Sequence, residues 1–352
     1  MKRLWRALAA FGYVAWPSLG LALVLAGSAA AQTEPLVSPP PQAVARGVWL
    51  IGEGIRPNRQ PDGNTVIFAA SPHDLVVMDT GRHAWGRRAI LDFAARHESR
   101  IIAIVNSHWH LDHVSGNPEL KRAFPGARVY ASRAIDEALT GFLARSVRDS
   151  QAYLEPGKLP AELQADIRND NATIANGEAL KPDVPIDVSR SVRFRRLTLR
   201  VNLARNAATA GDVWVYDVAS HVVAVGDLVT LPAPFLDTAC PEGWSRALDE
   251  VWATPFTLLA PGHGPVMNRS QFALYRSAFD TLIDCAKSPA PAAGCAAAWV
   301  HAVEPLLGPN PLDRRRAQGM TQDYVEGLLR ANGGRRTYCG AGTSIAQSSS
   351  GS

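Results

Sequence analysis

Three histidines and one aspartate fall within six residues, in the segment His108 to His113 (HWHLDH), directly after the apolar run Ile101 to Val105. A short, continuous run of this kind is typical of a strand that is buried on both faces, beneath helices. Loop residues at the end of such a strand are well placed to converge on an ion. Imidazole nitrogen and carboxylate oxygen are ligands that zinc takes, and no cysteine lies nearby to suggest a thiolate site. With only nine histidines in 352 residues, a chance His-rich turn is a poor alternative.

Two later segments can complete a metal site. Asp227 follows the apolar run Val222 to Val225, and His263 follows the run Phe256 to Ala260 within Pro-Gly-His-Gly-Pro. Each segment alone is weak, because a Gly-Asp pair is more often a turn and a histidine between glycines is commonly a solvent-facing loop residue. Together with the HWHLDH segment they predict a cluster of ligands at the ends of several strands.

The rest of the chain alternates between strand and helix patterns, which predicts two mixed sheets packed together with helices outside. The long polar stretch 156–185 reads as a loop or a short insertion. The final third contains helical patterns separated by Pro/Gly breaks. The expected strands are 47–52, 65–68, 74–79, 101–105, 127–131, 192–201, 213–216 and 222–226, and the expected helices are 85–97, 133–152, 271–286, 292–307 and 321–331.

These motifs resemble the metallo-β-lactamase-fold hydrolases in order and rough spacing, over about residues 44–268. The resemblance rests on the H-x-H-x-D-H run, on Asp79 in Met-Asp-Thr-Gly, on the Gly-Asp pair at Asp227 and on Pro-Gly-His-Gly around His263. Within that family, the sequence resembles the glyoxalase II-like branch more closely. Its similarity to the secreted, quinoprotein-associated members is weaker. It implies an α/β fold, the αβ/βα four-layer sandwich of two mixed β-sheets flanked by helices, with a metal cleft at the edge of the sheets.

The resemblance also implies a ligand set for zinc. His108 and His110 belong to a first zinc position, Asp112, His113 and His263 belong to a second, and Asp227 bridges the two. Asp79 would orient the ligand loop by hydrogen bonds.

The chain departs from the family pattern at one ligand. The family usually supplies a third histidine to the first position from a G-H-T-x-G-D turn, and here Ala208 stands in its place. We therefore expect one firmly bound zinc and a second that is possible but weak, unless Asn206 or Thr209 reaches the gap. Replacing Ala208 by histidine should raise the occupancy to two metals.

A metal with an open position generates hydroxide at neutral pH and polarises a carbonyl or phosphoryl oxygen. The prediction is a metal-dependent hydrolase that uses metal-bound hydroxide on a small ester, thioester or amide, with Asp112 and Asp227 as the catalytic proton carriers. A non-catalytic metal- or ligand-binding protein is the alternative that Ala208 favours. A β-lactamase is a further alternative, although the lactamases usually place cysteine or serine at the position of Asp227.

The first 31 residues have the pattern of a secretory signal. A basic start precedes the apolar stretch Ala7 to Gly27, and small residues end at Ala31, where we expect cleavage. An uncleaved membrane anchor is the alternative, although Pro17 and Gly20 interrupt the stretch. Cleavage would leave a periplasmic or secreted protein without stable membrane association.

The charge balance argues against a polyanionic partner. The formal net charge is +4, from 36 basic and 32 acidic residues, but Lys2, Arg3 and Arg6 lie within the signal, so the mature chain is nearly neutral. We expect a small-molecule substrate and no nucleic acid.

All four cysteines lie in the last third of the chain and fit an oxidising compartment. Among the three possible pairings we expect Cys285 with Cys295 and Cys240 with Cys339. The chain would then divide into a signal peptide (1–31), a linker (32–43), a metallo-β-lactamase-like domain (44–268), a helical C-terminal extension (269–341) and a disordered tail (342–352). A wall near Asp227 is expected from Phe235 to Thr238.

Overall fold

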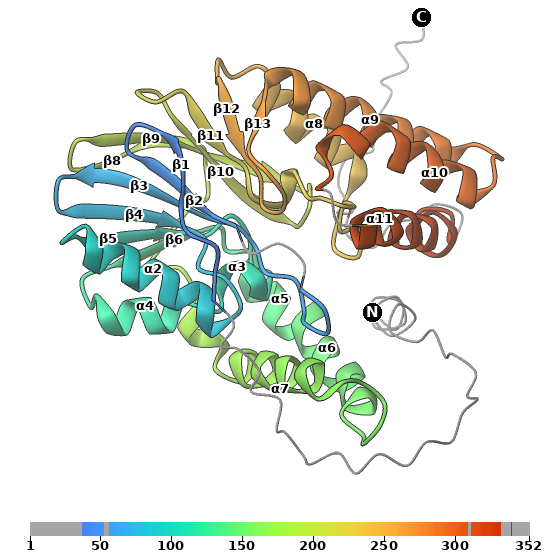
Figure 1. Ribbon diagram of the computed structural model, residues 1–352, viewed down its shortest axis with the longest axis horizontal. Coiled ribbons are helices and arrows are strands. Elements are labelled where there is room, and N and C mark those ends of the chain that lie inside the picture. Colours follow the sequence, from blue (N-terminus) through green and yellow to red (C-terminus); the bar gives the residue numbers. More distant parts are fainter. Residues whose placement is uncertain (1–36, 53–55, 309–310, 332–338, 340–352) are drawn as a thin grey trace, which may run out of the picture.

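A computed structural model describes residues 37–52, 56–308 and 311–331 together with Cys339 (Figure 1). The expected signal peptide, residues 1–31, and the expected disordered tail, residues 342–352, lie outside the described residues. Among the helices of the described part, none is long and apolar enough to span a membrane.

The first sheet has seven strands that lie side by side in the order of the sequence. The first four form an antiparallel meander, and the fourth to seventh are parallel. The first strand begins two residues before the expected domain start at 44. The strands are β1 (Gln42–Ala45), β2 (Val48–Ile51), β3 (Thr65–Ser71), β4 (Asp74–Met78), β5 (Arg100–Val105), β6 (Arg128–Ala131) and β7 (Val184–Pro185).

The second sheet has six strands in the order β13-β12-β11-β10-β9-β8. All neighbours are antiparallel except β11 and β12, which run parallel. The expected strand 192–201 is a hairpin of two strands, because the chain turns at Arg195 with φ 56°. The strands are β8 (Arg190–Phe194), β9 (Leu197–Arg205), β10 (Gly211–Asp217), β11 (Val222–Ala224), β12 (Leu258–Ala260) and β13 (Met267–Asn268).

The two sheets pack face to face, and helices cover their outer faces (Figure 1). Apolar residues of both sheets, such as Phe68, Val105, Leu199 and Val213, form one buried cluster between them. Against the first sheet lie α2 (Ala84–Arg96) and α4 (Asn117–Ala123), and against the second lie α8 (Pro241–Trp252) and α9 (Arg269–Lys287). These four layers confirm the predicted αβ/βα sandwich.

The connection from β6 to β7 is largely helical. It contains α5 (Ala134–Thr140) and α6 (Phe142–Ser150), which divide the expected helix 133–152 at Gly141, and then α7 (Ala161–Ala175). Of the two alternatives for 156–185, a loop or a short insertion, the loop was therefore wrong, because α7 lies within this stretch. The reason for the error is that α7 buries only a small apolar cluster around Leu163 and Ile167, so that its sequence shows little helical periodicity.

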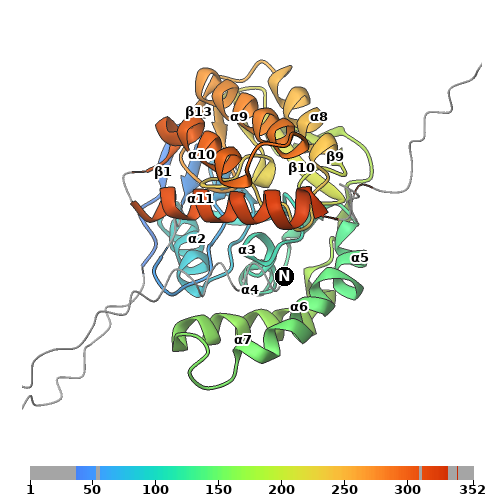
Figure 2. The same cartoon turned by 90° about the vertical axis from the view of Figure 1, so that its right-hand side faces the viewer.

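The C-terminal part adds helices to the second sheet. A capping box of Asn268 and Gln271 starts α9, which is followed by α10 (Ala292–Val303) and α11 (Pro311–Tyr324). The expected helix 321–331 is instead the end of α11 and a π-helical turn, Val325–Leu329. Both expected disulfides are present, Cys285 with Cys295 and Cys240 with Cys339. Figure 2 shows α11 crossing the side of the molecule on which α6 and α7 also lie.

Candidate metal centre

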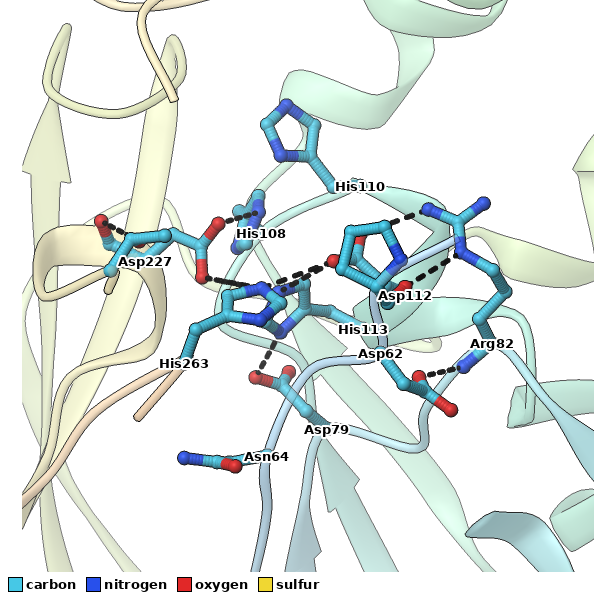
Figure 3. A network of polar contacts seen from close by, with 12 residues as sticks. Asp62, Asn64, Asp79, Arg82, His108, His110, Asp112, His113, Asp227 and His263 are labelled. Carbon is cyan, nitrogen blue, oxygen red and sulfur yellow. Dashed lines mark hydrogen bonds and ion pairs between the residues drawn. The ribbon is translucent and has the colours of Figure 1, made fainter. Parts of the chain in front are cut away.

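The candidate ligands lie at the carboxyl ends of two pairs of parallel strands, one pair in each sheet. In the first sheet Asp79 follows β4, and the HWHLDH segment follows the neighbouring β5 and leads into α3 (Leu111–Val114). In the second sheet Asp227 follows β11 and His263 follows β12. Because the sheets pack face to face, these four strand ends meet at one edge of the sandwich (Figure 3).

Two glycines permit the close approach of the loops. At Gly226, with φ 52°, a Cβ would lie 2.3 Å from the Cβ of Ser107, and at Gly262 it would lie 2.1 Å from Oδ1 of Asp227. Both contacts are too short for any side chain, so the loop that carries Asp227 can pack against its neighbours only with glycine at these positions.

Asp79 holds the ligand loop, as expected from its position. Its carboxylate accepts hydrogen bonds from the backbone N–H of Ser107 (2.7 Å), from Ser107 Oγ (2.7 Å) and from Nδ1 of His113 (2.8 Å). Carboxylates of this kind fix the tautomer and ring orientation of a ligating histidine.

The same hydrogen bonds decide which histidine nitrogens keep a lone pair. Ser107 Oγ gives its proton to Asp79, so it accepts from Nδ1 of His108 at 2.9 Å. In both His108 and His113, Nδ1 is therefore engaged as a donor, and Nε2 is the nitrogen that faces the interior and is available to a metal. Both Nε2 atoms are buried without a hydrogen-bond partner, as is Oδ1 of Asp227.

Four side chains surround a common point. Nε2 of His113 lies 3.7 Å from Asp112 Oδ2 and 3.2 Å from Asp227 Oδ1, and Nε2 of His263 lies 3.1 Å and 3.4 Å from the same two atoms. Metal–ligand bonds of 2.0–2.2 Å in a tetrahedron place the ligand atoms about 3.3–3.6 Å apart. The spacing of these atoms therefore fits a single tetrahedral ion.

The electrostatic field at this point favours positive charge. Burial lowers the pKa of His113 and of His263, but the carboxylates of Asp227 and Asp112 outweigh burial and raise both pKa values, with Asp79 acting on His113 as well. Burial likewise opposes the charged forms of Asp112 and Asp227, yet the neighbouring histidines hold the pKa of each carboxyl below its usual range. A site that stabilises protons on buried imidazoles in this way also stabilises a metal cation.

The first position predicted from the family pattern is less complete. Nε2 of His108 lies 3.6 Å from Oδ2 of Asp227, so the two carboxylate oxygens face different histidines. The ring of His110 lies 4.4 Å from that of His108, but its nitrogens are not among the ligand atoms that gather within 4.8 Å of one another. Burial lowers the pKa of His110 to about 4.

Neither Asn206 nor Thr209 fills the place of the missing histidine. Thr209 binds Asp212, and the backbone of Asn206 forms the turn with φ 51°. Instead Thr238 Oγ1 donates to the backbone carbonyl of Ala208 (2.9 Å) and accepts from Nε2 of His110 (3.0 Å). This contact leaves the lone pair of His110 on Nδ1. No sequence pattern pointed to it, because Thr238 follows His110 by 128 residues.

Arg82 connects the HWHLDH segment to α7, in the connection between β6 and β7. Arg82 contacts Asp170 of α7 at 2.5 Å. It also lies 3.4 Å from Asp112 Oδ1, and its backbone N–H donates to Asp62 (Figure 3). Burial lowers the pKa of Arg82, but the surrounding carboxylates outweigh it and keep the guanidinium charged. Its charge helps to hold Asp112 ionised in the candidate site.

A pocket of about 230 Å³ opens beside the candidate ligands. One wall comes from the ligand loop, α6 and α7, and includes Trp109, Phe142 and Ile167. The opposite side comes from the segment after Asp227 and from α11, and includes Phe235, which the sequence had placed in a wall near Asp227. Asp112, Asp227, His110 and His263 all reach the pocket surface.

Comparison with known proteins agrees with the fold. A family model described as the metallo-beta-lactamase superfamily matches residues 59–285. The chain therefore belongs to the metallo-beta-lactamase superfamily.

Two curated relatives match short segments. A hydroxyacylglutathione hydrolase from Gloeobacter violaceus is 50% identical over 46 residues, which are 13% of this chain and 18% of the relative. An atrochrysone carboxyl ACP thioesterase from Aspergillus fumigatus is 38% identical over 66 residues, which are 18% of this chain and 21% of the relative. The chain thus matches only about a fifth of the length of these relatives.

Solved structures share the fold. The sec-alkylsulfatase Pisa1 from Pseudomonas sp. has a TM-score of 0.57 at 19% identity, covering 84% of this chain and 50% of that one. A metallo-beta-lactamase from Pontibacter korlensis has a TM-score of 0.50 at 17% identity, covering 68% of this chain and 98% of that one.

Proposed function

We propose that this protein is a periplasmic, zinc-dependent hydrolase of small esters, thioesters or amides. Asp112, His113, Asp227 and His263 would hold one zinc firmly, and His108 and His110 would hold a second ion more weakly, with Asp227 between them. The observation that carries the proposal is the spacing of 3.1–3.7 Å between the nitrogen and oxygen atoms of the four residues.

The names of the two relatives favour thioesters within that range. Both the hydroxyacylglutathione hydrolase and the ACP thioesterase are named for cleavage of a thioester. The two disulfides support an oxidising compartment such as the periplasm.

Bound zinc would supply a Lewis acid and lower the pKa of water at the site. Proton transfer and the exclusion of water would come from residues of this chain. Asp112 and Asp227 line the pocket in their ionised forms, so either carboxylate can accept a proton during attack and return it to the leaving group. The apolar walls limit access of bulk water around the reacting bond.

Metal analysis and a substrate panel test the proposal together. Protein purified with zinc should contain at least one metal ion per chain, and a panel of small thioesters, esters, amides and β-lactams should show turnover with at least one class. Asp112→Ala should lower turnover at least about a hundredfold, as expected for loss of a proton carrier and ligand. Asp92→Asn, an exposed position on α2, is the matched control.

A non-catalytic metal-binding role is the second candidate, because Ala208 leaves the first position without its third histidine. Stoichiometric metal without turnover of any class would favour that role, and protein without metal would refute both. If Asp112→Ala unfolds the protein while the wild type shows no turnover, the metal is structural.

A further inference from the structure

We propose that Arg316 forms an anion-binding subsite in the pocket beside the candidate metal centre, which selects substrates carrying a single negative charge at the end of a short apolar segment. The inference rests on the proposed hydrolase function and names its substrate class. It assigns a role to α11, which lies beyond the part of the chain that the family model matches.

The pocket is lined by the charged residues Arg82, Asp112, Asp170, Asp227 and Arg316 and by many apolar side chains. Arg316 and Met320, one helical turn apart on α11, line it together with the metal-side residues Asp112, Asp227 and His263. The remaining lining is rich in apolar side chains, including Leu143, Ile167, Ile174, Leu231, Pro232 and Phe235. A ligand that spans from the candidate metal centre to Arg316 would therefore contact many apolar side chains along its length.

In the described part of the chain, Arg316 differs from Arg82, the other arginine of the pocket, in having no ion-pair or hydrogen-bond partner. Arg82 contacts Asp170 and Asp112. Among the described residues, Arg316 makes neither an ion pair within 4.0 Å nor a hydrogen bond, whereas Arg314, two residues earlier, contacts Glu304 at 2.9 Å.

The surroundings of Arg316 leave its charge incompletely balanced. Its side chain is half-buried, and burial lowers the pKa of the guanidinium, with only Asp313 opposing that effect. Asp313 acts on Arg316 from beyond ion-pair distance, and a guanidinium partly removed from water without a carboxylate in direct contact gains free energy when an anion binds.

The geometry favours a monoanion such as a carboxylate. The planar guanidinium matches a carboxylate in a bidentate arrangement. Arg316 lies in the middle of α11, where the backbone N–H groups already serve the helix, so they cannot supply the additional donors that a dianion such as phosphate uses. One positive charge therefore balances one negative charge.

The C-terminal helices hold α11 in place against the pocket. Ala317 and Thr321 on its inner face are fully buried, and Tyr324 Oη donates to Asp237 at 3.2 Å, just beyond the pocket-lining segment 230–235. The Cys285–Cys295 disulfide joins α9 to α10, which packs on α11. Arg316 is therefore presented on a fixed scaffold rather than on a free chain end.

A pair of thioesters that differ in one charge tests the subsite. Both share the same thiol and the same short acyl chain, which ends in a free carboxylate in one and in its methyl ester in the other. The wild type should show a kcat/KM about tenfold or more higher for the carboxylate, and Arg316→Ala should remove that preference mainly through KM. Arg316→Lys should keep part of it, and Arg315→Ala, an exposed position on the same helix, should keep all of it.

A binding measurement separates this inference from the proposed activity. Titration calorimetry with hexanoate and with hexanamide needs no turnover. Hexanoate should bind about tenfold more weakly to Arg316→Ala than to the wild type or Arg315→Ala, with metal content unchanged in all three. Equal hexanoate affinity in wild type and Arg316→Ala, or equal loss in both alanine variants, would overturn the subsite even if the protein proves to be a hydrolase.

Discussion

At the level of single residues, the candidate centre depends on hydrogen bonds that orient its histidines. Asp79 and Ser107 fix the rings of His113 and His108, and Thr238 fixes His110. In each case the partner occupies one ring nitrogen and leaves the other as the nitrogen that a metal can bind. The orientation of the candidate ligands therefore depends on Asp79, Ser107 and Thr238 as well as on the histidines themselves.

His83 shows how a buried histidine outside the candidate centre affects stability. Its side chain is 4% exposed, its Nε2 donates to Gln60 O at 3.0 Å, and its ring stacks on Trp85. Burial is the main cause that lowers its pKa to about 3. The folded protein therefore holds His83 neutral at a pH where the unfolded chain would protonate it.

We expect His83 to make the protein less stable in acid. Because its folded pKa is depressed, its stabilising contribution is complete above about pH 6.5 and is lost as pH falls towards 3. The free energy of unfolding should fall by about 1.4 kcal/mol per pH unit in that window, or about 2–3 kcal/mol from pH 6.5 to pH 4.5. Urea unfolding at several pH values should show a shallower dependence for His83→Gln than for the wild type. The exposed His301→Gln should retain the wild-type slope, and equal slopes in all three would contradict the assignment.

At the level of elements, the strand ends supply the candidate ligands and the helices shape the pocket. Parallel strands β4 and β5, and β11 and β12, end together and so bring distant loops to one edge. The insertion helices α6 and α7 and the C-terminal α11 then enclose the space beside them. The same centre with different helices would accept different substrates.

The two disulfides should contribute unequally to the free energy of unfolding. Cys240 and Cys339 are 99 residues apart, whereas Cys285 and Cys295 are 10 apart. Chain entropy predicts stabilisation of up to about 5 kcal/mol for the longer loop and up to about 3 kcal/mol for the shorter one. Urea unfolding of the two double Cys→Ser variants should show the larger loss for Cys240 and Cys339. The reverse order would mean that native contacts, not loop closure, dominate.

At the level of the whole molecule, most buried apolar side chains belong to two large clusters, one between the sheets and one beneath α8, α9 and α10. We expect these clusters to hold the fold together without an ion at the candidate centre. We therefore expect a metal to add stability to a fold that forms without it.

Removal of metal should lower the melting temperature without unfolding the protein at 25 °C. A metal present at a thousand times its dissociation constant stabilises the native state by about 4 kcal/mol. Thermal melts with and without chelator should differ accordingly, re-addition of zinc should restore the transition, and the far-ultraviolet circular dichroism at 25 °C should stay unchanged. Loss of that signal on chelation would show that the fold itself requires the ion.

The sandwich fold and the loops that carry the candidate ligands could be predicted from the amino-acid sequence, whereas the cysteine pairing was one choice among three that the structure confirms. The fold and the loops were predictable because apolar runs that end in His, Asp and Gly are local signals, and because the family motif spans them. The sequence also located Asp79 and the gap at Ala208, both of which lie in recognisable turns.

The surroundings of those residues became known only from the three-dimensional structure. Thr238 reaches His110 across 128 positions, and Arg82 reaches Asp170 across 88. Helix α7 was not predicted because few of its side chains are buried. In the sequence Arg316 is one of several arginines on a polar helix, and only the structure shows that it lines the pocket. Contacts between distant segments follow from how the helices pack, and neither periodicity nor motif spacing records that packing.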